Sequence, residues 1–156
     1  MDVLKFKQAM SKYPSGIAIV TIIDDQGKMG LTLSTFNSLS LDPLLIMFSL
    51  AKKAARYQRL VEAENFAINI LSDSQAEVSK LFAVNQEVDW DKLGFSNSTA
   101  NHSPLIRGIS AYFDCKLHNI VDGGDHIIVI GKVVEAEYFD EDPLIYHDRK
   151  YKKLES

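Results

Sequence analysis

The segment from Gly30 to Pro43 is crowded with polar side chains of the kind that hydrogen-bond small ligands. Six hydroxyl or amide residues fall within nine positions and alternate with apolar ones, namely Thr32, Ser34, Thr35, Asn37, Ser38 and Ser40. A water-facing strand normally carries Lys, Glu or Arg, yet positions 30–41 contain none of these. Small polar groups on a strand surface suit a close-fitting ligand held by hydrogen bonds. The alternative is a Ser/Thr-rich strand and turn whose hydroxyls bond the nearby backbone.

A second chemical feature is a group of cations one strand later, in the run Ser49–Arg56 (SLAKKAAR). Lys52, Lys53 and Arg56 gather where a helix over Ala54–Ala63 is expected to begin. The free N–H groups and positive dipole at a helix start favour an anion, and cations there oppose the dipole unless an anion joins them. The arrangement predicts a phosphate site, with a solvated basic turn as the alternative.

His126 and an aromatic tail are the remaining candidates. The run Asp122-Gly123-Gly124-Asp125 is a strong hairpin signal, so His126 stands at the entrance of the next strand, where its ring can point to a barrel mouth. The tail Tyr146–Tyr151 combines flat rings with cations, which suits stacking on a nucleotide. The alternatives are a surface histidine and a tail that docks on the body or contacts a second copy.

Composition and missing motifs exclude several classes of protein. The net charge of −4 is spread without a basic block, so we expect no nucleic-acid partner. No apolar run reaches the roughly 18 residues of a membrane span, and no signal peptide is expected. Cys115 is the only cysteine, which excludes an internal disulfide and fits a reducing cytoplasm; its apolar surroundings predict a core residue. We find no zinc spacing, no Gly-x-Ser-x-Gly elbow, no Walker loop and no Gly-x-Gly-x-x-Gly fingerprint.

The elements that must position these residues are mostly strands joined by hairpins. We expect about six or seven strands and three short helices within one domain over 1–156, forming an antiparallel barrel with peripheral helices. A capping box at Ser74 and Glu77 is expected to open one helix. The predicted segments are a helix before Pro14, strands over Ile17–Ile23, Gly30–Leu41, Leu44–Leu50, Phe66–Leu71, Tyr112–Val121 and Ile127–Phe139, and a long loop over Asn85–Pro104.

Five segments, in order along nearly the whole chain, resemble the short-chain flavin reductase family, the reductase components of two-component aromatic monooxygenases. The matching segments are Phe6–Thr21 (FKQAMSKYPSGIAIVT), Gly30–Pro43, Asn65–Leu71 (NFAINIL), Ser103–Cys115 (SPLIRGISAYFDC) and Gly124–Gly131 (GDHIIVIG). The resemblance implies a dimeric FMN-binding split β-barrel. It also implies that NADH or NADPH reduces FMN or FAD, and that the reduced flavin leaves for a separate monooxygenase.

The resemblance also implies roles for individual residues. Thr32–Ser38 would contact the isoalloxazine and ribityl chain, Ser49–Ala51 the pyrimidine edge or ribityl, and Lys53 with Arg56 the phosphate. His126 would lie by the nicotinamide as the catalytic residue, with Tyr146, Arg149 and Tyr151 as further candidates. The full cofactor-binding set is Thr32, Leu33, Ser34, Thr35, Phe36, Asn37, Ser38, Ser49, Leu50, Ala51, Lys53, Ala54, Arg56, Phe82, His126, Tyr146, Arg149 and Tyr151. The alternative function is a flavin-binding electron carrier, or a flavin-dependent oxidase, that does not release its flavin.

Overall fold

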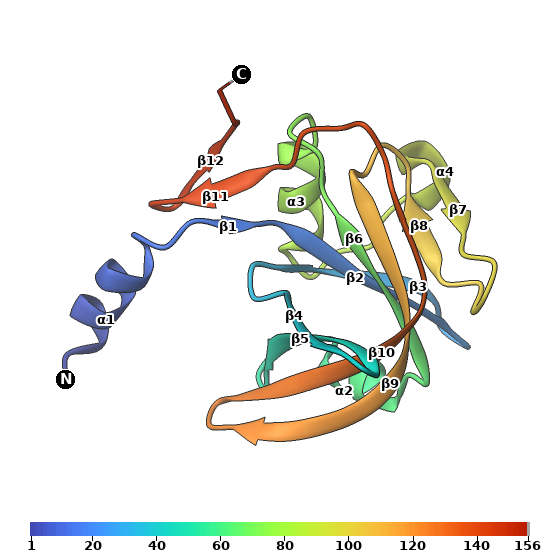
Figure 1. Cartoon of the computed structure of the whole chain (residues 1–156), viewed down its shortest axis with the longest axis horizontal. Coiled ribbons are helices and arrows are strands. Elements are labelled where there is room, and N and C mark those ends of the chain that lie inside the picture. Colours follow the sequence, from blue (N-terminus) through green and yellow to red (C-terminus); the bar gives the residue numbers. More distant parts are fainter. Residues whose placement is uncertain (156) are drawn as a thin grey trace.

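The computed structural model describes residues 1–155 and is mostly antiparallel β-structure (Figure 1). Its helices are α1 (Val3–Met10), α2 (Tyr57–Glu62), α3 (Ala76–Phe82) and α4 (Trp90–Leu93). None of these helices is long and apolar enough to cross a membrane.

The strands form three sheets, of seven, three and two members. They are β1 (Ser15–Gly16), β2 (Ala18–Asp24), β3 (Gly27–Leu33), β4 (Asn37–Leu41), β5 (Leu44–Ala51), β6 (Asn65–Ile70), β7 (Phe95–Asn97), β8 (Pro104–Ile106), β9 (Ala111–Gly123), β10 (His126–Tyr138), β11 (Ile145–His147) and β12 (Lys150–Lys152). The largest sheet has the order β3-β2-β6-β9-β10-β5-β4, and all its pairs are antiparallel.

The large sheet curls until its two edges approach each other. Its edge strands, β3 and β4, are consecutive in the chain, and only Ser34, Thr35 and Phe36 join them. Four residue steps span at most about 14 Å, so these edges cannot lie far apart. The two edges are not paired with each other within residues 1–155. This arrangement is the predicted split barrel, with its opening at the β3–β4 junction.

The sheet is covered on both faces, which explains why β2 is apolar from Ala18 to Ile22 except at Thr21, whose hydroxyl donates to the carbonyl of Pro104. Ala18, Val20 and Ile22 point into the main core, while Ile19 packs into a second core with Phe82 and Leu144. Alternate residues of a strand face opposite sides, so a strand buried on both sides must be apolar or have its polar groups hydrogen-bonded. Gly30 allows the close approach of α3, because a Cβ there would stand 2.5 Å from the Phe82 ring.

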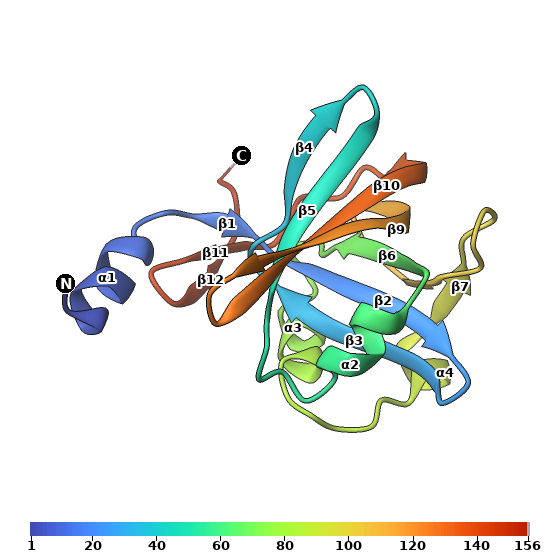
Figure 2. The same ribbon diagram turned by 90° about the horizontal axis from the view of Figure 1, so that it is seen from below.

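The C-terminal hairpin and the N-terminal helix lie at one side of the barrel. Strands β11 and β12 pair with each other, and β11 also pairs with β1. Helix α1 begins at Asp2, whose side chain accepts a hydrogen bond from the backbone N–H of Leu4 at 3.0 Å. It has no buried residue and projects from the body in two perpendicular views (Figures 1 and 2).

Four local expectations are corrected. The polar segment is not one strand but two, interrupted at Ser34–Phe36 where the chain crosses from one sheet edge to the other. Helix α2 starts at Tyr57, later than expected, after a turn. The capping box is wrong, since Gln75 is the N-cap of α3 and makes no side-chain cap bond. The segment expected as a loop over Asn85–Pro104 contains α4 and β7.

Candidate functional site

A cleft lies at the opening of the barrel, where the polar segment was predicted to bind a ligand. We call it the split cleft; its volume is about 270 Å³. Its lining comes from the end of β3, the end of β5 and the start of β10. The lining residues are Leu31, Thr32, Leu33, Ser34, Thr35, Ser49, Leu50, Ala51, Ala54 and His126. The structure therefore brings together nine of the predicted site residues, which lie up to 94 positions apart along the chain.

Thr35 fixes the crossing between the two sheet edges. Its hydroxyl donates to the carbonyl of Ser49 at 3.1 Å and accepts from the N–H of Ser49 at 3.0 Å. This pair of bonds mimics a step of strand pairing and holds the junction against the end of β5. The hydroxyl of Thr32 likewise donates to the carbonyl of Ser79 in α3, at 2.7 Å. Both threonines therefore bond the backbone, as the alternative predicted, but through partners distant in the sequence rather than through nearby residues.

Two serines keep free hydroxyls. Within residues 1–155 the side chains of Ser34 and Ser49 make no hydrogen bond, and both residues line the split cleft. Each hydroxyl can donate one bond and accept others. These two serines are consequently the side-chain hydroxyls of the cleft that can serve a ligand without breaking a bond of the fold.

His126 is held at the mouth of the cleft by its strand register. It lies opposite Ala51 of β5 and opposite Gly123 of β9. Its Nδ1 lies 2.7 Å from Oδ1 of Asp125, and this bond lowers the pKa of the Asp125 carboxyl. Lys52 stabilises the turn that precedes His126. Its backbone N–H donates to the carbonyl of Asp125 at 3.0 Å, and its ammonium forms an ion pair with Asp122.

The three cations predicted to bind a phosphate differ in the partners that their side chains have in the structure. Lys52 is paired with Asp122, and that pairing raises its pKa. Arg56 donates to Oδ1 of Asn85 at 3.3 Å and to the carbonyl of Gln86 at 2.7 Å, so it holds the segment after α3. Lys53 is exposed and has no ion-pair partner within the described chain. Of the three cations, Lys53 is therefore the exposed one without a partner, and it lies in the turn between Ala51 and Ala54, which line the cleft.

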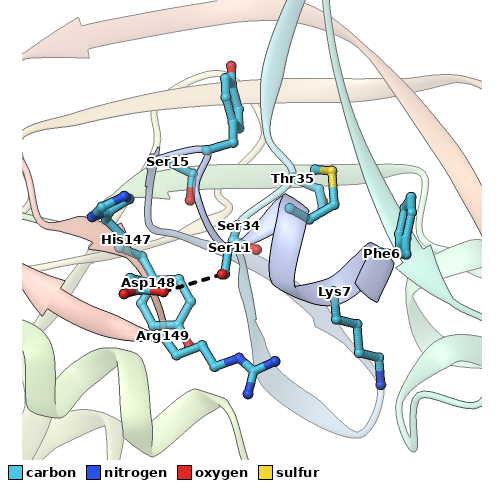
Figure 3. Close-up of a pocket in the computed structure, with 12 residues that line it drawn as sticks. Phe6, Lys7, Ser11, Ser15, Ser34, Thr35, His147, Asp148 and Arg149 are labelled. Carbon is cyan, nitrogen blue, oxygen red and sulfur yellow. Dashed lines mark hydrogen bonds between the residues drawn. The ribbon is translucent and has the colours of Figure 1, made fainter. Parts of the chain in front are cut away.

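A larger cleft of about 550 Å³ adjoins the first, since Ser34 and Thr35 line both. Helix α1 forms one side and the β11–β12 hairpin the other (Figure 3). We call it the hairpin cleft. Besides Ser34 and Thr35, it includes two more of the predicted residues, Tyr146 and Arg149.

The hairpin turn is bound to the end of α1. The N–H of Asp148 donates to the carbonyl of Ser11 at 2.9 Å, and its carboxylate accepts from the Ser11 hydroxyl at 3.3 Å (Figure 3). Lys12 lies 3.5 Å from the same carboxylate and lowers its pKa. Asp148 and Arg149 have φ values of 51° and 62°, a region that non-glycine residues seldom adopt.

Several predicted residues line neither cleft. Asn37 and Ser38 are exposed at the start of β4, and Phe36 packs against Phe113 with ring centroids 5.4 Å apart. Phe82 is 2% exposed and lies in the second core against Trp90. Tyr151 packs on Tyr146 and bonds the hydroxyl of Ser79 at 2.9 Å, so it supports the hairpin cleft from behind.

Sequence reasoning did not find the contribution of α1. Phe6, Lys7, Met10 and Tyr13 line the hairpin cleft, although none was predicted as a site residue. The sequence does show an apolar face on this helix. That the core leaves this face uncovered becomes clear only once the rest of the fold is known. Lys7 and Arg149 approach this cleft from its two sides (Figure 3).

Comparison with known proteins decides the family. The model of the flavin reductase like domain matches residues 10–155. The chain belongs to this family. It is 38% identical over 138 residues to a flavin reductase of Pseudomonas putida, covering 88% of this chain and 81% of that protein.

Other relatives agree with this assignment. The chain is 40% identical over 130 residues to the reductase component of the flavin-dependent trigonelline monooxygenase of Acinetobacter baylyi, covering 83% of this chain. It spans only 42% of that relative's length. Among solved structures, it superposes with a TM-score of 0.93 and 26% identity on the NADH:FAD oxidoreductase SgcE6 of Streptomyces globisporus, in complex with NAD and FAD fragments. That match covers 99% of this chain and 93% of the other. The predicted family and fold class are thus confirmed.

Proposed function

We propose that this protein is an NAD(P)H-dependent flavin reductase that reduces FMN or FAD and releases the reduced flavin to a separate monooxygenase. The observation that carries the proposal is the split cleft itself, opening directly into the hairpin cleft. A reductase of this kind needs two adjacent sites, one for the flavin and one for the nicotinamide cofactor, and Ser34 and Thr35 form a shared border between two such spaces. Ligand pockets have volumes of about 300–1,000 Å³, and the joined clefts fall in this range.

The lining of the split cleft fits a flavin. Leu31, Leu33 and Leu50 supply apolar surface for a flat ring, and the hydroxyls of Ser34 and Ser49 supply donors and acceptors at its edge. Lys53 stands beside the cleft as a cation for the phosphate. When bound, the nicotinamide supplies a hydride and the flavin accepts it, so the protein needs to orient the two rings and need not supply an acid–base pair.

Our candidate for contact with the nicotinamide is His126, which lines the split cleft. It stands at the mouth of the cleft, and Asp125 orients its ring through the 2.7 Å bond at Nδ1. The other ring nitrogen is then free to hydrogen-bond a ligand. We therefore assign His126 to nicotinamide positioning, with Arg149 and Tyr146 of the hairpin cleft as partners.

We further propose that the protein is a homodimer. Helix α1 exposes Val3, Leu4, Phe6 and Met10, whose exposed fractions run from 52% to 65%. The β4–β5 hairpin, which projects in Figure 2, exposes Leu39, Leu41 and Leu44. Apolar surface of this extent supports an interface between protein chains. Light scattering on the purified protein tests this state, and a monomeric mass would contradict it. A cytoplasmic location is also proposed, on the single unpaired cysteine alone.

The deciding experiment is anaerobic mixing of the protein with excess FMN or FAD and with NADH or NADPH, while the absorbance of oxidised flavin is followed. We expect many equivalents of flavin to be bleached per protein, because the reduced product must leave. Bleaching of one equivalent would instead indicate an oxidase-like enzyme that keeps its flavin. Flavin binding without bleaching would indicate an electron carrier.

The phosphate assignment has a matched pair of variants. Lys53→Ala is expected to weaken binding of FMN by about threefold to tenfold, the effect of one lost charge-assisted contact, and to leave riboflavin unchanged. Lys52→Ala removes a neighbouring cation that is already paired with Asp122, and should affect the two flavins equally. Equal losses for FMN and riboflavin in Lys53→Ala would remove the phosphate site from this position.

A further inference from the structure

A third cavity, of about 550 Å³, lies on the barrel away from both clefts, beside β7, β8 and the far end of the β9–β10 ribbon. We call it the ribbon groove. Nine residue steps along β10 lead from His126 to Glu135, which corresponds to about 30 Å of strand. In both views β7 and α1 lie at opposite ends of the molecule (Figures 1 and 2). The groove is therefore separate from the proposed flavin and nicotinamide sites.

The floor and walls of the groove are apolar. Leu105, Ile106 and Ile109 form the floor and are 6%, 2% and 4% exposed. The rings of Tyr112 and Phe139 stand beside each other with centroids 6.4 Å apart and an interplanar angle of 33°. Phe139 is 47% exposed, so an aromatic face remains open to a ligand. An apolar and aromatic lining of this kind suits a small organic ligand with an apolar portion.

The rim of the groove carries three carboxylates against one guanidinium, so its net charge is negative. Glu135, Glu137 and Glu141 line it, and no ion pair to any of them occurs within residues 1–155. Glu135 contributes charge rather than a free bonding position, because both its oxygens accept hydrogen bonds from Thr99, Tyr112 and Ala100, which lower its pKa to about 2. Glu137 and Glu141 are therefore the carboxylates that a ligand can contact. Arg107 also lines the groove, but its guanidinium lies over Gly94 and pairs with none of these carboxylates. The groove therefore gathers negative charge around an aromatic surface.

From this combination we infer that the ribbon groove is a binding site for an organic cation with an apolar body, such as a quaternary or aromatic ammonium compound. A cation held over an aromatic face is attracted by the negative charge of the ring face, and carboxylates at the rim attract it further. A neutral compound of the same shape would gain only the apolar contact, and an anion would be repelled by the rim.

The test uses benzyltrimethylammonium as the probe and backbone amide resonances of the intact protein as the readout. We expect probe-dependent shifts that cluster over 96–109 and 135–141. Benzyl alcohol should bind at least threefold more weakly and benzoate not at all. Saturating FMN should leave the affinity for the probe unchanged, since the flavin occupies a different cleft.

Two acidic residues of the groove supply the test variants, and a neighbouring acidic residue outside it, Asp140, supplies the matched control. Glu141→Gln and Glu137→Gln are each expected to weaken the probe about threefold, as one partly exposed charge contact would. Asp140→Asn removes the same charge from a residue that does not line the groove, and should leave the affinity unchanged. The inference is overturned by an absence of shifts in the groove, by equal affinity for benzyl alcohol, by equal losses in Asp140→Asn, or by displacement of the probe with FMN.

Discussion

The two ends of the β9–β10 ribbon use polar residues in opposite ways. Near His126, the hydroxyls of Ser34 and Ser49 make no hydrogen bond within residues 1–155, and the His126 ring bonds only Asp125. At the other end, Asp114 of β9 is fully buried and accepts bonds from Ser98, Asn101 and Ser103. We call Asp114, Glu135 and the loop Ser98–Ser103 the carboxylate cluster. Polar groups that make all their hydrogen bonds within the chain stabilise the fold. Groups that keep unused donors or acceptors are available to ligands.

Asp114 provides the largest expected effect. Asp114→Ala leaves the hydroxyls of Ser98 and Ser103 and the N–H of Asn101 without their acceptor in a buried place. We expect the free energy of unfolding to fall by about 3 kcal/mol, because each orphaned buried donor costs roughly 1–3 kcal/mol. Urea unfolding measures the change.

The same variant also probes the separation of the two regions. The KM for NADH of the folded Asp114→Ala protein should stay near that of the wild type, since the cluster lies at the far end of the ribbon. A loss of stability below 1 kcal/mol, or a large rise in KM, would contradict the division of roles.

This cluster also marks the limit of what the sequence predicts. Apolar alternation and turn residues were enough to predict the strand framework, the hairpin at Asp122–Asp125 and the burial of Cys115, which is 0% exposed. They placed Asp114 on the strand face opposite Cys115, with no indication that a loop covers that face. Its donors come from Ser98–Ser103, a segment without periodicity, so only the folded chain shows the contact.

The candidate site shows the same limit. The polar run correctly located the split cleft, because small hydroxyl residues without charges are unusual on an exposed strand. It did not show that Thr32 and Thr35 bond to Ser79 and Ser49, since those partners lie 47 and 14 residues away. Which hydroxyls remain free depends on tertiary contacts that no local pattern contains.

The pH dependence of stability probes the cluster through Glu135. Its pKa of about 2 in the folded protein lies below the ordinary 4.5. Its contribution is therefore complete above pH 4.5 and is lost as the pH falls from about 4.5 to 2. We expect this loss to be about 1–2 kcal/mol, reduced by solvent screening at a partly exposed carboxylate.

The measurement compares urea midpoints of the wild type and Glu135→Gln between pH 6 and pH 3. The difference between the two proteins should shrink as the pH falls, because below about pH 4.5 Glu135 binds a proton in the unfolded chain while it stays ionised in the folded wild type. A difference that stays constant over this range would mean that Glu135 is not held as a carboxylate by Thr99 and Tyr112.

His126 tests the open region. His126→Ala is expected to raise the KM for NAD(P)H about tenfold, the effect of losing roughly 1.4 kcal/mol of hydrogen bonding, and to leave flavin affinity unchanged. The free energy of unfolding should change little, since the ring bonds only the exposed Asp125. Asp125→Asn keeps the ring and removes only the charge that orients it, so it should show a smaller rise in KM. Unchanged NAD(P)H kinetics in His126→Ala would exclude the assigned role.

Substitutions of Arg149 are expected to have small effects, and they distinguish backbone strain from a role in binding at the hairpin cleft. Arg149 has a φ of 62°, and it has no ion-pair partner within residues 1–155. A strained residue is retained where its side chain serves a purpose, whereas glycine adopts this conformation without steric cost. Arg149→Gly should therefore raise the free energy of unfolding by up to about 1 kcal/mol while raising the KM for NAD(P)H. Arg149→Lys keeps the charge and the strain, so its KM should lie between those of the wild type and Arg149→Gly. If Arg149→Gly were more stable and had an unaltered KM, Arg149 would have a role only in the turn. His126 and Tyr146 would then be the remaining candidates for nicotinamide binding.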